Sequence, residues 1–168
     1  HKEANDLEGF RMDVLKYLAV DFDIKEEDTS KAINALRLLN VKGFNITMPG
    51  KTAALSCCDE LSKAAQLIGA VNTVVNENGK LIGHNTDGLG WVRNCREHGF
   101  EIRGKKMTIA GSGGAATAIE ITSALEGMSE ISIFARKDTF FANAEATVEK
   151  IRRHVSGCRV NLYDLEDR

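Results

Sequence analysis

The clearest signal of fold class in this chain is the stretch Met107-Thr108-Ile109-Ala110-Gly111-Ser112-Gly113-Gly114-Ala115-Ala116. Its apolar start predicts a strand over residues 107–110, and the glycines predict a tight loop that leads into a helix. The loop fits the pattern G-x-G-x-x-A through Gly111, Gly113 and Ala116. In that pattern the first glycine allows the turn, the second lets the backbone approach a pyrophosphate, and the small third residue packs helix on strand. The stretch therefore predicts the start of a dinucleotide-binding unit.

The same kind of pattern continues to the end of the chain. Periodicity predicts further elements over Gly114 to Glu126 (helix), Glu130 to Ala135 (strand), Phe140 to Arg153 (helix) and Cys158 to Leu162 (strand). This β-α-β-α-β run is the first half of a Rossmann, or doubly wound, sheet. The alternative for the loop alone is a glycine-rich turn that binds no ligand. Because strand, loop, helix and second strand all have the expected spacing, we favour the dinucleotide site.

The second strand ends at Arg136-Lys137-Asp138, where the pattern places the adenosine ribose. A carboxylate there binds the free ribose hydroxyls of NAD, whereas a basic side chain pairs with the 2′-phosphate of NADP. Both kinds of residue are present, so the sequence predicts NADP, NAD or both as cofactor. We expect the pyrophosphate to be held mainly by backbone N–H groups at the start of the helix. The candidate residues there are Gly111, Ser112, Gly113, Gly114 and Ala115.

The first half of the chain has a different, mixed α/β pattern. It predicts a strand within Val14 to Ile24, a helix after Asp28 that ends near Asn40, and a buried strand over Gly43 to Ile46. A helix capped by Asp59 and ended by Gly69 should follow. We then expect a hairpin of Val71 to Val75 and Leu81 to His84 around Asn78-Gly79, and a helix from Thr86 or Asp87 to Gly99. The polar stretch 101–106 then separates the two halves. We place the domain boundary there, which gives one α/β domain over 1–103 and a partial NAD(P)-binding Rossmann domain over 104–168.

Two polar clusters of the first half carry groups that suit chemistry. The first is Asn45-Ile46-Thr47-Met48-Pro49-Gly50-Lys51, and the second is Asn85-Thr86-Asp87-Gly88. Pro49 interrupts regular strand pairing, so we expect Thr47 and Lys51 on an exit loop. The predicted hairpin brings Asn72 and Asp87 to its open end.

Alone, the lysine is typical of a solvated surface charge and the aspartate of a turn or helix cap. Together, a lysine and a carboxylate can transfer protons, and the short hydrogen-bonding side chains around them suit a polyhydroxylated ligand. With a dinucleotide site beside them, the clusters predict hydride transfer on a small polar substrate.

Composition excludes several other classes of function. The chain has 22 basic and 24 acidic residues with no long run of one sign, which argues against nucleic-acid or anionic-membrane partners. Its four cysteines show neither a metal-binding spacing nor a secreted disulfide framework, so we predict no metal and a cytoplasmic location. No apolar run is long enough for a membrane span. The oligomeric state cannot be predicted from these features.

The motifs resemble those of the shikimate dehydrogenase family in order and spacing. The resemblance is carried by the Gly43 to Lys51 stretch, by Gly69-Ala70-Val71-Asn72-Thr73, by Gly83-His84-Asn85-Thr86-Asp87-Gly88 and by the glycine loop. Arg136-Lys137-Asp138-Thr139-Phe140-Phe141 looks most like the quinate/shikimate dehydrogenase branch, which uses either nicotinamide cofactor. The resemblance implies a substrate-binding α/β domain over 1–103, followed by the first half of a Rossmann domain.

The family resemblance also implies roles for individual residues. Lys51 and Asp87 would form the catalytic pair, and Thr47, Asn72 and Asp87 would hold the ring hydroxyls of shikimate or quinate. The implied reaction interconverts shikimate and 3-dehydroshikimate, or quinate and 3-dehydroquinate. The family has an N-terminal strand with a Ser-x-Ser motif and a second half of the nucleotide domain that we do not find here. We therefore expect this chain to be the central part of a two-domain dehydrogenase.

Two alternatives stay open on the sequence. One is a non-catalytic nucleotide- or metabolite-binding module, which would bind but not turn over. The other is a related two-domain dehydrogenase that acts on a folate or an amino acid. That enzyme would not need the pairing of Asn-x-Thr-x-Pro-x-Lys with Asn-Thr-Asp-Gly, which makes it the weaker interpretation.

Overall fold

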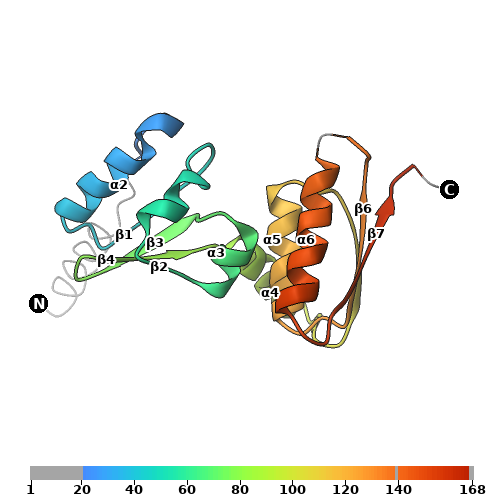
Figure 1. The fold of residues 1–168 in the computed structure, drawn as a ribbon. Helices are drawn as coiled ribbons and strands as arrows, with labels where there is room; N and C mark the ends of the chain where they lie inside the picture. Colours follow the sequence, from blue (N-terminus) through green and yellow to red (C-terminus); the bar gives the residue numbers. More distant parts are fainter. Residues whose placement is uncertain (1–20, 139, 167–168) are drawn as a thin grey trace, which may run out of the picture.

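A computed structural model describes residues 21–138 and 140–166 of the chain. It contains two separate β-sheets, one in each half of the sequence, with helices between and around them (Figure 1). The strand predicted within Val14 to Ile24 lies mostly outside the described residues. The predicted strand covers residues 17–22, and its two described residues, Asp21 and Phe22, form no strand, so that part of the prediction is wrong.

The first sheet has four strands in the order β1-β3-β4-β2. They are β1 (Gly43–Asn45), β3 (Thr73–Glu77), β4 (Lys80–His84) and β2 (Glu60–Leu61). The predicted hairpin of β3 and β4 is confirmed: Asn78 and Gly79 have φ values of 56° and 95°, as a tight turn with two left-handed residues requires. β1 is antiparallel to β3, and β2 is parallel to β4. The fold is therefore mixed α/β in this half.

Helices α2 (Thr29–Leu38) and α3 (Lys63–Ile68), with short 3₁₀ helices η1 (Glu26–Asp28) and η2 (Ala53–Cys57), accompany this sheet. The expectation that Asp59 caps α3 is wrong. Ser62 is the cap, since its hydroxyl accepts a hydrogen bond from Ala65 N at 3.2 Å. Asp59 lies before β2 and instead accepts from Leu81 N at 2.7 Å, which ties the end of η2 to β4. Gly69 ends α3 with φ 78°, as predicted.

The second sheet is the predicted β-α-β-α-β unit. Strands β5 (Lys106–Ala110), β6 (Glu130–Ala135) and β7 (Arg159–Asp164) run parallel in the order β5-β6-β7. Helices α5 (Gly114–Leu125) and α6 (Phe141–His154) connect them. Ile131 and Ile133 of β6 are 0% exposed. Burial of one such side chain contributes about 1.5–3 kcal/mol to folding stability. A shift of β6 by one residue would expose both isoleucines, so the alternation sets its register.

One hydrophobic cluster joins the two halves. It contains Leu67 of α3 and Val92 of α4 (Asp87–Glu97) together with Ile121 of α5 and Ile131 of β6. Ile102, just before the expected domain boundary, is also 0% exposed within this cluster. The boundary at 103/104 stays a prediction, but the halves share a core at this point. In the described part of the chain, no helix is long and apolar enough to cross a membrane.

Glu120 in the middle of α5 is an ionisable side chain enclosed by this packing. It is 0% exposed, and both carboxyl oxygens lack a hydrogen-bond partner among the described residues. Burial raises the pKa of Glu120 from its ordinary value of 4.5 to about 7. Between these values the folded chain keeps the proton while the unfolded chain releases it. Folding stability therefore falls as the pH rises through this window.

We predict that the free energy of unfolding is lower at about pH 8 than at about pH 4.5 by an amount on the order of 3 kcal/mol, because of Glu120. Glu120→Gln removes the ionisation and should flatten this part of the pH profile. Urea unfolding across the pH range measures the effect. Glu145→Gln, on the exposed surface of α6, is the control and should leave the slope in place. An equally steep profile in Glu120→Gln would contradict the assignment.

Candidate active site

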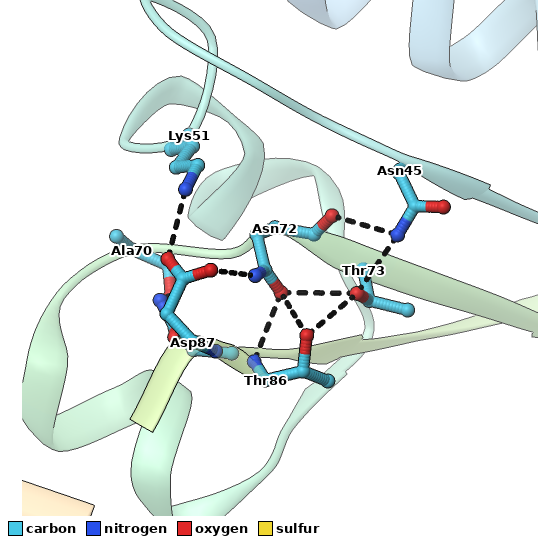
Figure 2. A network of polar contacts seen from close by, with 8 residues as sticks. Asn45, Lys51, Ala70, Asn72, Thr73, Thr86 and Asp87 are labelled. Carbon is cyan, nitrogen blue, oxygen red and sulfur yellow. Dashed lines mark hydrogen bonds and ion pairs between the residues drawn. The ribbon is translucent and has the colours of Figure 1, made fainter. Parts of the chain in front are cut away.

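Lys51 is held at the end of the loop that follows β1. The loop contains a cis Met48–Pro49 peptide, and the Lys51 carbonyl accepts a hydrogen bond from Val71 N at 2.9 Å. Val71 is fully buried, so this bond fixes the loop against the start of the hairpin. The Lys51 ammonium group lies 2.9 Å from Asp87 Oδ2 (Figure 2). The two side chains are 23% and 40% exposed, so the pair is partly open to solvent rather than enclosed in the core.

Asp87 is the first residue of α4, where the helix dipole stabilises a negative charge. Asn85 sets its position. The Asn85 side chain is 2% exposed; its amide donates to the carbonyl of Ala70 at 3.1 Å, and its carbonyl accepts from Asp87 N at 3.2 Å. Asn85 therefore joins the start of α4 to the segment between α3 and β3, and its role is structural.

Asn72 lies between the two polar clusters and is 8% exposed. Its Nδ2 donates to Asp87 Oδ1 at 2.7 Å, so Asp87 accepts a hydrogen bond on each oxygen, from Lys51 and from Asn72. Asn72 Oδ1 accepts from Thr86 N at 3.0 Å, from the Thr86 hydroxyl at 3.2 Å and from the Thr73 hydroxyl at 3.0 Å (Figure 2). The amide is thus held at both ends, and it holds the carboxylate in turn.

The residues expected at the site from the sequence are only partly brought together. Lys51, Asn72 and Asp87 are in direct contact. Thr47 lies in the loop between β1 and η2 with an exposed side chain, and no hydrogen bond within the described residues joins that side chain to the cluster. The sequence analysis missed Thr73 and Asn45. The available signal was the alternation in β3, which puts Thr73 on the same face as exposed Val75 and opposite buried Val74.

The glycine loop between β5 and α5 has the geometry that a pyrophosphate requires. Gly111 has φ 129°, which only glycine adopts readily, and its N–H donates to Phe134 O at 2.8 Å. A Cβ added at Gly113 or at Gly114 would meet no atom within 4 Å. Gly113 precedes the helix and has no side chain with which to cap it. The first turn of α5 therefore has no side-chain cap, and N–H groups at such a helix start suit an anionic group.

The three residues after β6 are exposed and have different partners. Asp138 Oδ1 accepts from Phe140 N at 2.8 Å, so one carboxylate oxygen shapes the turn into α6. Lys137 lies 3.2 Å from Asp164 Oδ2 at the end of β7. The Glu166 N–H and the Lys137 ammonium both lower the pKa of Asp164. Arg136 is exposed beside them.

Helices α4 and α5 bring the polar cluster and the glycine loop into one neighbourhood. Gly88 follows Asp87 directly and packs on α5 at Ala118 and Thr122. Ala118 comes four residues after α5 begins at Gly114, which is about 6 Å of helix. The packing of α4 on α5 therefore places the start of α4, with Asp87, near the N-terminal half of the helix that follows the glycine loop.

Comparison with known proteins agrees with this arrangement. Residues 6–74 match the family model described as shikimate dehydrogenase substrate binding domain. A shikimate dehydrogenase (NADP(+)) of Listeria innocua is 50% identical over 160 residues, covering 95% of this chain and 55% of that protein. The crystal structure of shikimate 5-dehydrogenase from Listeria monocytogenes, in complex with shikimate and NAD, has a TM-score of 0.84 and 52% identity over 87% of this chain and 50% of that one. The chain belongs to the shikimate dehydrogenase family.

Membership of this family confirms the resemblance expected from the motifs. A quinate dehydrogenase from Corynebacterium glutamicum, solved in complex with NAD, is also similar, with a TM-score of 0.70 and 30% identity over 80% of this chain and 47% of that one. The chain spans about half the length of the curated relatives it matches.

We predict that Gly88→Ala destabilises the fold, because the new methyl group would overlap the carbonyl oxygen of Ala118, which cannot move without distorting α5. Overpacking of this kind typically costs about 1–3 kcal/mol. Gly90→Ala is the matched control on the same helix, since a methyl group there meets nothing within 4 Å. It should stabilise α4 by up to about 1 kcal/mol through helix propensity. Thermal unfolding of both variants checks this, and equal stability would show that α4 and α5 do not need the close approach.

Proposed function

We propose that this chain belongs to an NAD(P)-dependent oxidoreductase that interconverts shikimate and 3-dehydroshikimate, and that quinate and 3-dehydroquinate are further substrates. The proposal rests on one observation: a lysine, a carboxylate and an amide, Lys51, Asp87 and Asn72, are hydrogen-bonded together, and Asp87 begins the helix α4 that packs against α5, the helix of the glycine loop. The names of the relatives support the same reaction, because they include shikimate dehydrogenase with NADP and quinate dehydrogenase with NAD.

In this proposal Lys51 is the proton donor and acceptor at the reacting oxygen. Asp87 already accepts a hydrogen bond on each oxygen, so it orients the Lys51 ammonium group rather than supplying a proton itself. Each of its oxygens has a second lone pair, which can accept from a ring hydroxyl of the substrate. Asn72 Nδ2 has a second N–H for the same purpose. Thr47 adds a hydroxyl on the loop that leads to Lys51.

The nicotinamide cofactor, when bound, supplies or accepts the hydride. The chain would bind its pyrophosphate through the backbone N–H groups of Ser112 to Ala115, where the open space in front of Gly113 admits the phosphates. Arg136, Lys137 and Asp138 would contact the adenosine ribose. Because Arg136 suits a 2′-phosphate and Asp138 suits a free hydroxyl, we propose that both NADP and NAD are used.

A cytoplasmic location and a small-molecule substrate complete the proposal. The described cysteines, Cys57, Cys58, Cys95 and Cys158, are all free thiols. Burial raises the pKa of the Cys58 and Cys158 thiols, which keeps them protonated and poorly reactive. Reduced cysteines of this kind suit a reducing compartment.

We predict that Lys51→Ala in the complete parent enzyme lowers kcat by about 10²–10⁴-fold, because a positioned acid or base acts mainly in the transition state. Cofactor affinity should change little. The rate is measured from the absorbance of the reduced nicotinamide with shikimate, and binding of shikimate and of each cofactor by calorimetry. Lys105→Ala, a surface lysine of the second half, is the control.

The same measurements separate the alternatives. In the complete parent enzyme, binding of shikimate and cofactor without turnover would favour a non-catalytic binding module. Binding of neither would contradict the proposed function. Turnover in Lys51→Ala at the unmodified rate would remove Lys51 from the proton transfer while leaving the substrate assignment intact.

We predict that Asp138→Asn shifts cofactor preference toward NADP. The amide oxygen can still accept from Phe140 N, so the turn into α6 is kept while the negative charge that repels a 2′-phosphate is removed. An exposed charge contact contributes at most about 1 kcal/mol, so the ratio of kcat/KM for the two cofactors should change several-fold and by no more than about tenfold. Arg136→Ala should shift the ratio toward NAD. An unchanged ratio in Asp138→Asn would leave Asp138 with its structural role alone.

A further inference from the structure

The loop that carries Lys51 is tied at its start and at its end to the same residue, Asn72. Asn45, the last residue of β1, donates from Nδ2 to the carbonyl oxygen of Asn72 at 3.4 Å and to the hydroxyl of Thr73 at 3.1 Å. At the other end of the loop, Lys51 reaches Asn72 through Asp87. A ring is therefore closed by the loop and by hydrogen bonds that join Asn45, Thr73, Asn72, Asp87 and Lys51 in that order (Figure 2).

The direction of each hydrogen bond in this ring follows from the inventory of donors. The main-chain oxygen of Asn72 can only accept, so Asn45 must present its NH₂ group. The second hydrogen of that group then points at the Thr73 hydroxyl, which accepts it. Thr73 has one hydrogen of its own, and the nearer acceptor is Asn72 Oδ1 at 3.0 Å rather than the Thr86 hydroxyl at 3.4 Å. The donors therefore run from Asn45 through Thr73 to the Asn72 side chain.

This direction has a consequence for the catalytic pair. Thr86 N is donor-only and also contacts Asn72 Oδ1, so the oxygen of that amide is held away from Asp87 and the NH₂ group is held toward it. Asn72 Nδ2 then donates to one oxygen of Asp87 and leaves the other for Lys51. Any loosening of the Asn72 amide would let the carboxylate rotate and would misplace the ammonium group.

We propose that Asn45 and Thr73 are positioning residues of the site: through hydrogen bonds that run Asn45 to Thr73 to Asn72, they hold the amide that aligns Asp87 and Lys51 for the substrate. The proposal rests on the proposed function for its substrate. Asn45 and Thr73 themselves need not touch that substrate. Hydrogen-bond chains of this type strengthen one another in a partly buried setting, because each donor that also accepts becomes more polar.

Thr73→Val tests the proposal, since valine has the shape of threonine and lacks its hydroxyl. Loss of one hydrogen bond from the chain should weaken shikimate binding and lower kcat/KM by about three- to tenfold, with cofactor affinity unchanged. Thr73→Ser restores the hydroxyl and should recover most of the loss. Thr108→Val, an exposed threonine of β5, is the matched control and should change nothing.

A double-mutant cycle separates positioning through Asn72 from a general loss of structure. In an Asn72→Ala background the amide is gone, so Thr73→Val should then have little further effect on shikimate affinity. Additive losses would overturn the proposal, and so would a Thr73→Ser variant as weak as Thr73→Val. A purely structural role would lower thermal stability without this non-additivity.

A second readout needs no substrate at all. One side-chain amide proton of Asn72 is donated to Asp87 Oδ1 and the other is not, so their NMR signals should be separate in the unmodified chain, with the donated proton slow to exchange. In Thr73→Val and in Asn45→Ala that proton should exchange faster with water. Unchanged exchange in both variants would overturn the positioning role. Absence of shikimate binding by the unmodified chain would instead contradict the proposed function, so the two failures are distinguishable.

Discussion

The close packing of α4 on α5 at Gly88 sets how the two halves of the chain meet. Only a residue without a side chain lets α4 lie against the carbonyl of Ala118 and the side chain of Thr122. Asp87 is the preceding residue, and the glycine loop precedes α5. One backbone contact therefore sets the spacing between the carboxylate of the first half and the glycine loop of the second. The shared hydrophobic cluster, with Val92 and Ile121 buried in it, makes that spacing rigid.

Around Asp87 the polar groups are arranged so that donors converge on a single carboxylate. Lys51 and Asn72 each donate to one of its oxygens, and Asn85 accepts from its backbone N–H. Charge-assisted hydrogen bonds of this kind are short and directional, which suits a site that must hold a lysine in one place. The loop from β1 to Lys51 is anchored at both ends by the same group of residues. Few of these contacts would form without the hairpin that brings Asn72 and Asp87 together.

Much of the fold was predictable because its signals are local. Alternation in β6, the glycine loop before α5 and the Asn78-Gly79 turn each depend on a few neighbouring residues. The errors came where tertiary contacts overrode a local signal. Asp59 has the chemistry of a helix cap, but its carboxylate is used by Leu81 N and Arg37, and α3 begins later at Ser62. A carboxylate that could cap a helix can instead accept from another nearby donor, and the sequence alone does not show which donors lie near it.

The family, the Rossmann half and three residues of the candidate site, Lys51, Asn72 and Asp87, could be predicted from the sequence, because the motifs are contiguous and their spacing is specific. The contacts that hold these residues could not be predicted in this way. The hydrogen bonds from Asn45 and Thr73 to Asn72 join β1 to β3, and they depend on the antiparallel register that pairs Asn45 with Thr73. The buried, unpaired carboxyl of Glu120 likewise follows from the packing around α5 and not from any local pattern. Side chains far apart in sequence acquire such roles only when sheet register and helix packing are known.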